Sequence, residues 1–157
     1  MNVYVREVYD DECKSLYTAD ILKKLPEWFG NQIALKEYVK TVKEHPYFAA
    51  FDDENICIGF FSLRLHYQHT GEIYVCGVSP EVHHKGIGKA IFIECEKYFI
   101  NAGCKYLIVK TLSDLITYKP YENTRKFYES IGFSSLITLT EMWDEDNPCL
   151  LMIKQLY

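Results

Sequence analysis

The chain has 157 residues, 48% of them hydrophobic, and a formal net charge of −5 at pH 7. This length predicts a single domain, residues 1–157, that is large enough to bury a core. The negative charge argues against nucleic acid as a partner. No apolar run approaches the roughly 20 residues that cross a bilayer, so no membrane partner is expected.

The cysteines and the N-terminus indicate the compartment. The six cysteines are scattered without a Cys-x-x-Cys pair, which argues against a zinc site and favours reduced thiols. The first residues lack the basic start and the apolar stretch of a signal peptide. We therefore expect a cytoplasmic protein without a bound metal.

Polar caps and apolar periodicity predict the elements of the first half of the chain. Asp10 or Asp11 is a candidate cap for a first helix that Pro26 ends, and Asn31 is a candidate cap for a second helix. An acidic turn at 52–55 joins two strands into a hairpin. The expected elements are strands 3–9, 47–51, 56–65 and 72–78 and helices 11–25 and 31–45.

The second half of the chain predicts a parallel crossover and a closing hairpin. A helix from near Gly88 to Gly103 lies between strands 72–78 and 105–111, and this order of strand, helix and strand is a parallel crossover. The remaining elements are a helix at 122–131 and strands 134–143 and 149–156. The chain is thus predicted to be α/β, with a mixed, mostly antiparallel sheet and helices on both faces.

The run from Val78 to Lys89 joins an apolar strand to an amphipathic helix through a turn with two glycines, Gly86 and Gly88. The first amides of a helix have no partner within it and lie at the positive end of its dipole, so they bind anions. Glycines allow a phosphate to approach the backbone closely. The pattern predicts a pyrophosphate site, and the alternative is an ordinary turn between a strand and a helix.

The spacing of the glycines does not match two common phosphate-binding motifs. A nucleotide P-loop needs four residues between its first glycine and Gly-Lys-Ser/Thr, whereas one residue separates Gly86 from Gly88, and Ala90 follows Lys89. A dinucleotide fingerprint needs a third glycine, which is missing here.

The run instead resembles the acyl-coenzyme A loop of the GNAT acetyltransferase superfamily, Val-x-Pro-x-x-Gln/Arg-x-x-Gly-x-Gly/Ala. The matching residues are Val78, Pro80, Gly86 and Gly88. His83 occupies the Gln/Arg position. This departure affects a side-chain contact at most, because such a loop binds mainly through backbone donors.

A second segment resembles the other signature of the superfamily, Asn-x-x-Ala-x-x-x-Tyr-x-x-x-Gly-Phe. Tyr128 stands at the Tyr position, Thr124 at the Ala position and Tyr121 in place of the Asn, and Gly132 and Phe133 match. The resemblance implies the GNAT fold over essentially the whole chain, with Tyr128 as the acid that protonates the departing thiolate. The alternative is a helix tyrosine that fills the core.

The resemblance also implies acetyl-CoA as a co-substrate. The residues expected to bind it are Cys76, Gly77, Val78, His83, His84, Lys85, Gly86, Ile87, Gly88, Lys89, Tyr121 and Thr124. Lys85 and Lys89 either flank the phosphates as point charges or are solvated lysines. Adjacent histidines on a turn rarely converge on one ion, so His83 and His84 are not expected to bind a metal.

Glu72 begins a run that resembles the strand of histone-type members in which a glutamate takes the proton of the acceptor amine, often through water. An aliphatic ammonium is not a nucleophile until a base accepts its proton. Alternation along the strand places Glu72, Tyr74 and Cys76 on one face. The alternative for Glu72 is an exposed glutamate at a strand end, and Cys76 is expected to pack rather than to carry the acyl group.

Four aromatic residues are candidates for the acceptor site. Trp28 and Phe29 lie between the first two helices, a region that commonly covers the acceptor in this family, and Tyr74 and Trp143 are expected near the same cleft. Aromatic faces suit an ammonium group. The alternative is that these residues belong to the core.

We therefore interpret the chain as a transferase, an acetyl-CoA-dependent N-acetyltransferase. It would move the acetyl group directly to a primary amine of a small molecule or peptide in a ternary complex. A module that binds or senses acyl-CoA without turnover is the alternative, and a nucleotide-dependent enzyme is a third interpretation. Because members of the family are often dimers, a homodimer is a further expectation.

Overall fold

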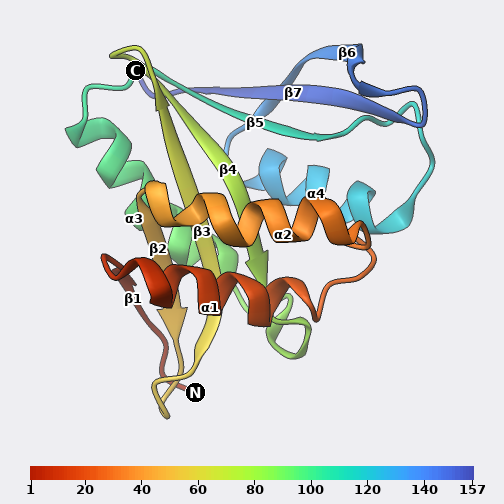
Figure 1. Ribbon diagram of the computed structural model, residues 1–157. Helices are drawn as coiled ribbons and strands as arrows, with labels where there is room; N and C mark the ends of the chain where they lie inside the picture. Colours follow the sequence, from red (N-terminus) through yellow and green to blue (C-terminus); the bar gives the residue numbers. More distant parts are fainter. The chain divides into compact units, whose positions relative to one another are not determined.

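The computed structural model describes residues 1–157 (Figure 1). Seven strands form a mixed sheet in the order β1-β2-β3-β4-β5-β7-β6. The strands are β1 (Tyr4–Glu7), β2 (Tyr47–Phe51), β3 (Cys57–His66), β4 (Thr70–Val78), β5 (Tyr106–Leu112), β6 (Ser134–Asp144) and β7 (Asn147–Gln155). The helices are α1 (Asp11–Leu22), α2 (Gln32–Thr41), α3 (Ile87–Asn101) and α4 (Lys119–Ser130), with short 3₁₀ helices η1 (Val42–Glu44) and η2 (Pro80–Val82). The predicted α/β class is confirmed.

The chain divides into two compact units. The first comprises residues 1–64 and 74–99, and the second comprises residues 65–73 and 100–157. Strands β3 and β4 contribute to both units, and the division within β4 falls between Ile73 and Tyr74. A single domain over residues 1–157 stays a prediction.

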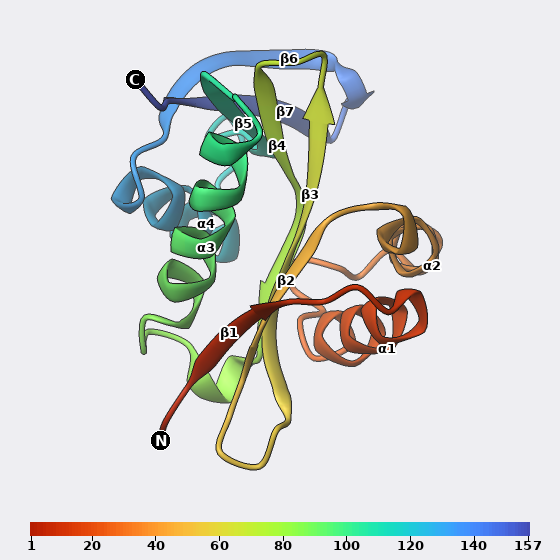
Figure 2. The same ribbon diagram turned by 90° about the vertical axis from the view of Figure 1, so that its left-hand side faces the viewer.

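In the first unit, α1 and α2 cover one face of the strands and α3 covers the other (Figure 2). The core under α1 and α2 includes Ile21, Leu22, Val42, Tyr47, Phe51 and Phe60, all buried. On α3, Ile91, Cys95 and Phe99 are buried as the apolar stripe predicts. Burial of one large apolar side chain contributes about 1.5–3 kcal/mol, so both faces hold their helices firmly against the sheet.

Both helix caps expected on α1 and α2 are present. Asp10 Oδ1 accepts a hydrogen bond from the amide of Cys13 (2.9 Å). Asn31 Oδ1 accepts from the amides of Ile33 (3.0 Å) and Ala34 (3.1 Å). These amides lie in the first turns of the helices, where no backbone acceptor exists for them.

Two helices end earlier than the sequence predicts. α1 stops at Leu22, because Leu25 donates its amide to the Leu22 carbonyl in a tighter turn (3.1 Å) ahead of Pro26. Residues that precede a proline disfavour the α conformation. α2 stops at Thr41 and continues as η1, so the predicted α-helix through His45 is wrong in its last turn.

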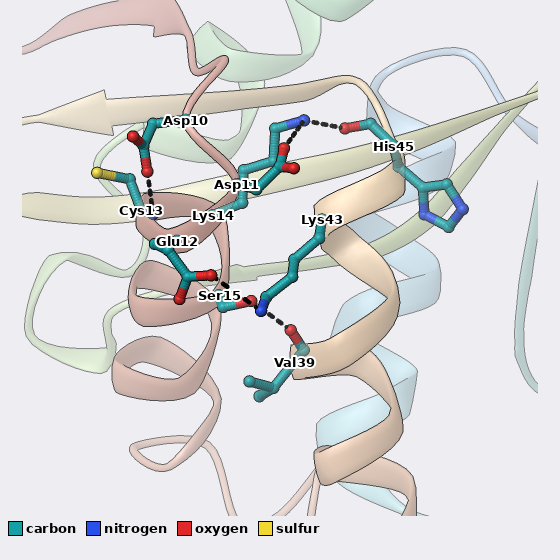
Figure 3. A network of polar contacts seen from close by, with 9 residues as sticks. All are labelled: Asp10, Asp11, Glu12, Cys13, Lys14, Ser15, Val39, Lys43 and His45. Carbon is teal, nitrogen blue, oxygen red and sulfur yellow. Dashed lines mark hydrogen bonds and ion pairs between the residues drawn. The ribbon is translucent and has the colours of Figure 1, made fainter.

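A buried lysine and a serine on α1 tie this helix to α2 and η1 (Figure 3). Lys14 Nζ donates to the carbonyl oxygen of His45 (2.7 Å), and Ser15 Oγ donates to the carbonyl oxygen of Val39 (2.6 Å). Val39 lies in the last turn of α2, where carbonyls lack intrahelical donors. The polar side of α1 thus satisfies backbone groups that would otherwise be buried unpaired.

In the second unit, β5 joins a parallel pair to an antiparallel one. Residues 70–73 of β4 pair in parallel with residues 106–109 of β5, as the crossover predicts. β5 then pairs antiparallel with β7, and β7 with β6. α4 begins at Lys119, earlier than predicted, because Pro120 fits the first helical turn, where an amide is not needed.

Removal of the Asn31 cap tests the start of α2. The change Asn31→Ala leaves the amides of Ile33 and Ala34 without their side-chain acceptor, so the free energy of unfolding should fall by about 1 kcal/mol. Urea denaturation followed by circular dichroism measures this loss. Gln32→Ala, at the exposed first residue of the helix, is the matched control and should change stability by less than about 0.5 kcal/mol. Equal stability of Asn31→Ala and the natural chain would contradict the cap.

Candidate active site

The loop between β4 and α3 folds back onto the strand that it leaves. η2 turns the chain after Ser79, and the ring of His83 reaches the end of β4. Its Nε2 lies 2.7 Å from the carbonyl oxygen of Val78. Since a carbonyl only accepts, Nε2 carries the hydrogen and donates it. His83, the departure from the motif, thus fixes the loop to the strand.

Two residues of this loop have left-handed backbone angles, His84 with a φ of 62° and Gly86 with a φ of 79°. α3 starts at Ile87, and a hydrogen bond runs from the Ala90 amide to the Gly86 carbonyl (3.0 Å). Ala90 is thus the first residue of the helix whose amide has a backbone acceptor at its N-terminus, and the amides of residues 87–89 have none within the helix. Left-handed residues before a helix N-terminus direct several amides to one place, which is an arrangement that binds anions.

The side chains around these amides agree with either interpretation of the loop. Lys85 and Lys89 are exposed, so their charges are available to an anion and are also well solvated. Cys76 and Val78, at the end of β4, are half-buried. Cys76 is a free cysteine.

Gly77, which the sequence assigns to cofactor binding, has a packing role. A Cβ at this position would lie 3.0 Å from Leu25 Cδ1 and 3.1 Å from Ile21 Cγ2. Such distances are tighter than ordinary contacts between a side chain and its neighbours. The glycine therefore allows α1 to approach β4, whatever else it binds.

Three of the four aromatic residues predicted for the acceptor site lie in the first unit. The Trp28 ring meets the His83 ring edge-on, with centroids 6.0 Å apart. Phe29 contacts Tyr38 (5.9 Å), and Tyr38 contacts Tyr74 (5.5 Å). Tyr38 of α2 thus joins Phe29 to Tyr74.

Tyr74 is fixed at its hydroxyl group and at its ring face. Its hydroxyl lies 2.8 Å from Thr41 Oγ1, and the guanidinium carbon of Arg64 lies 3.7 Å from the ring centroid. This is a cation–π contact within the chain, so one face of the ring is already occupied. Trp143 belongs to β6 in the second unit and is 45% exposed.

Glu72, in the second unit, is a buried and ion-paired carboxylate. Its side chain is 3% exposed, with Oε1 2.6 Å from Nε2 of His66 and Oε2 3.6 Å from Nζ of Lys110. The alternative of an exposed glutamate at a strand end is therefore wrong. Sequence reasoning missed His66 and Lys110, because alternation along one strand does not show which residues of neighbouring strands lie beside it.

Tyr121, Thr124 and Tyr128 all lie on α4, also in the second unit. Tyr128 is 5% exposed, and its ring lies 5.6 Å from that of Phe127 and 5.9 Å from that of Phe133. This burial agrees with the core-filling alternative and equally with an acid that is shielded from bulk water. Tyr121 and Thr124 are half-buried.

No group of three or more His, Cys, Asp or Glu side chains is placed to hold a metal ion. No helix has both the length and the apolar character needed to span a membrane. The six cysteines are free. Burial raises the pKa of the Cys57 thiol to about 12 and the pKa of Cys95 well above its usual value, so these two thiols pack as apolar groups.

Comparisons with known proteins identify the family and the fold of this chain. The model of the acetyltransferase (GNAT) family matches residues 5–133. The chain is 33% identical over 104 residues to a mycothiol acetyltransferase of Renibacterium salmoninarum. The aligned region covers 62% of this chain and 26% of that protein. The chain therefore spans about a quarter of the length of this curated relative.

Two solved structures share the fold. A GNAT family protein from Desulfovibrio desulfuricans matches with a TM-score of 0.82 and 19% identity, over 99% of this chain and 100% of that chain. A GNAT family acetyltransferase from Elizabethkingia anophelis, solved with acetyl-CoA bound, matches with a TM-score of 0.70 and 16% identity, over 99% of each chain.

The fold is the one that these GNAT structures share, as the sequence predicts. The chain belongs to the acetyltransferase (GNAT) family. The family and fold inferred from the two motifs are confirmed, whereas the roles assigned to single residues stay predictions.

The change Gly86→Ala tests the backbone geometry of the loop. A Cβ at this position would meet no atom within 4 Å, so its effect comes from the left-handed φ of 79°. Alanine in this region is disfavoured by about 1–2 kcal/mol, and the free energy of unfolding should fall by a similar amount. Gly86→Asn is the control, because asparagine tolerates left-handed angles better. Equal losses for alanine and asparagine, measured by urea denaturation, would contradict this explanation.

Proposed function

We propose that the chain transfers an acetyl group from acetyl-CoA directly to a primary amine of a small molecule or peptide. Membership of the acetyltransferase (GNAT) family supports this proposal. The observation that carries it is the set of amides at residues 87–89, which follow the left-handed His84 and Gly86. Such a set suits the diphosphate of coenzyme A.

In this proposal the co-substrate is held by the loop and by the end of β4. The diphosphate accepts hydrogen bonds from the backbone between His84 and Lys89, with Lys85 and Lys89 as nearby charges. The pantetheine arm pairs with the end of β4 that includes Cys76, Gly77 and Val78. Tyr121 and Thr124 on α4 are proposed to contact the same molecule.

The chemistry needs a base, a donor for the oxyanion and an acid. Glu72 is proposed to accept a proton from the acceptor ammonium, after which the amine nitrogen forms a bond to the thioester carbon. The backbone N–H near Val78 steadies the negative oxygen, and one such donor is typically worth about 3 kcal/mol. The carbon–sulfur bond then breaks, the thiolate takes a proton from Tyr128, and the Tyr128 phenolate is restored by the second proton that the amine nitrogen loses as the amide forms. Holding amine and thioester together supplies much of the remaining rate.

The acceptor is proposed only as a class. The curated relative is called a mycothiol acetyltransferase, but this chain spans 26% of it. Trp28, Phe29 and Tyr74 offer aromatic surface for an ammonium group, with Trp143 as a further candidate. A cytoplasmic location and a homodimer stay predictions.

A module that binds acyl-CoA without turnover is the second candidate. Two observations favour it: Glu72 is held by His66 and Lys110, and the Tyr128 ring packs between aromatic neighbours. Both side chains therefore have structural roles that need no reaction. The two candidates share the same loop and differ only in turnover.

A thiol-release assay separates these candidates. Acetyl-CoA is incubated with polyamines, aminoglycosides, amino acids or short peptides, and reactions without an amine correct for the protein's own thiols. We expect release with at least one amine, and Tyr128→Phe should lower kcat by about 100-fold while circular dichroism stays unchanged. Tyr106→Phe, at a tyrosine of β5 that is 40% exposed, is the matched control and should keep full activity.

Binding of acetyl-CoA is measured by calorimetry in parallel. Binding without thiol release across the whole panel would favour the non-catalytic module. Absence of binding to well-folded protein would overturn the proposed function altogether, since the loop amides carry the proposal.

A further inference from the structure

The His66–Glu72 pair joins an accessible side chain to a buried one. The pair is short, 2.6 Å between Nε2 and Oε1, and the two residues lie at the ends of β3 and β4 that flank the same turn. The side chain of His66 is 39% exposed, whereas that of Glu72 is 3% exposed. A neighbouring charge, Lys110 Nζ, lies 3.6 Å from the other carboxylate oxygen.

Glu72 alone is poorly placed to finish a proton transfer. Both of its oxygens face a partner inside the protein, Oε1 toward His66 and Oε2 toward Lys110. A proton accepted by this carboxylate must leave before the next turnover, yet its burial keeps it from bulk water. The proton therefore needs a route through a neighbouring group.

His66 has the properties that such a route requires. Its Nε2 is engaged by Glu72, and no hydrogen bond involves Nδ1. Imidazole is the side chain that gains and loses a proton between pH 5 and 8, and an exposed ring exchanges protons with buffer directly. Lys110, as an ammonium, only donates hydrogen bonds and has no lone pair that could accept the proton. Of the two side chains that contact Glu72, His66 is thus the one that can accept a proton and pass it on.

We propose that His66 is the proton-relay residue of the acetyl transfer, a role that rests on the proposed function. The ammonium of the acceptor gives one proton to the Glu72 carboxylate, and the amine keeps the electron pair that attacks the thioester. In this step His66 is the neutral tautomer with hydrogen on Nδ1, so Nε2 is free to accept and the proton crosses from Oε1 to Nε2. An imidazolium forms, which loses its Nδ1 proton to water and returns to neutral imidazole by exchanging tautomers. No oxidant or further reactant is needed.

Other titratable groups near the pair do not offer a competing route. Cys149 on β7 senses the charges of Glu72 and Lys110, and burial raises the pKa of its thiol. It is buried and stays protonated near neutral pH, so it neither supplies nor accepts the proton. Among these groups, His66 combines access to solvent with a ring that can both accept and release a proton.

Two substitutions at His66 test the relay. His66→Gln keeps a polar side chain beside Glu72 but cannot carry a proton near pH 7, and His66→Ala leaves room for added imidazole. His69→Gln is the matched control, because His69 is exposed in the turn between the same two strands. The assay uses acetyl-CoA with the best amine of the thiol-release panel, and circular dichroism checks that each variant is folded.

We expect His66→Gln to lower kcat by about 10- to 100-fold, with KM for acetyl-CoA within about twofold of the natural value. Added imidazole should restore most of the kcat of His66→Ala, and His69→Gln should match the natural chain. A purely structural His66 would instead give unchanged kcat in the glutamine variant, or a loss that imidazole does not restore, and either result overturns the relay.

Failure of the relay and failure of the proposed function give different results. If the natural chain releases thiol with an amine and His66→Gln does so at the same rate, only the relay is wrong. If the natural chain binds acetyl-CoA but releases no thiol with any amine, the acetyltransferase proposal fails, and the relay fails with it.

Discussion

The connection from β4 to α3 is the constraint on which the proposed chemistry depends. A strand ends, the chain turns through left-handed angles at His84 and Gly86, and a helix begins with unpaired amides. The hydrogen bond from the His83 ring to the Val78 carbonyl fixes this turn to its strand. An anion site made of backbone donors is only as precise as the turn that aims them. In the proposed function, His83 therefore supports ligand binding by fixing the turn to its strand.

The two ends of β4 differ in their surroundings. Its first residues, 70–73, pair in parallel with β5 and include the buried Glu72, whereas its last residues lead into the loop. The division between the two compact units falls at the end of that ladder, between Ile73 and Tyr74. The charged residue is thus anchored in regular sheet, where Lys110 and His66 hold it. Beyond this ladder β4 continues to Val78, and the loop proposed to bind the anion follows it.

What the sequence could predict follows from the range of each interaction. The caps at Asp10 and Asn31 act over three residues or fewer and were predicted correctly. The family followed from two motifs that each lie within one short segment. The partners of Glu72 and the contact of Arg64 with Tyr74 depend on which strands lie side by side and in which register. A single sequence does not encode that register in any local pattern, so the burial of Glu72 was missed.

Residues chosen for function also serve the packing of the chain, and this overlap has a physical cause. Gly77 admits α1 to within contact distance of β4, and Tyr128 fills a space beside Phe127 and Phe133. A reacting group must be held within a few tenths of an ångström, and close packing is the means by which a protein holds any side chain. Burial alone therefore does not distinguish a catalytic tyrosine from a structural one. Glu72 shows the same overlap: its contacts with His66 and Lys110 hold the carboxylate in place whether or not it accepts a proton.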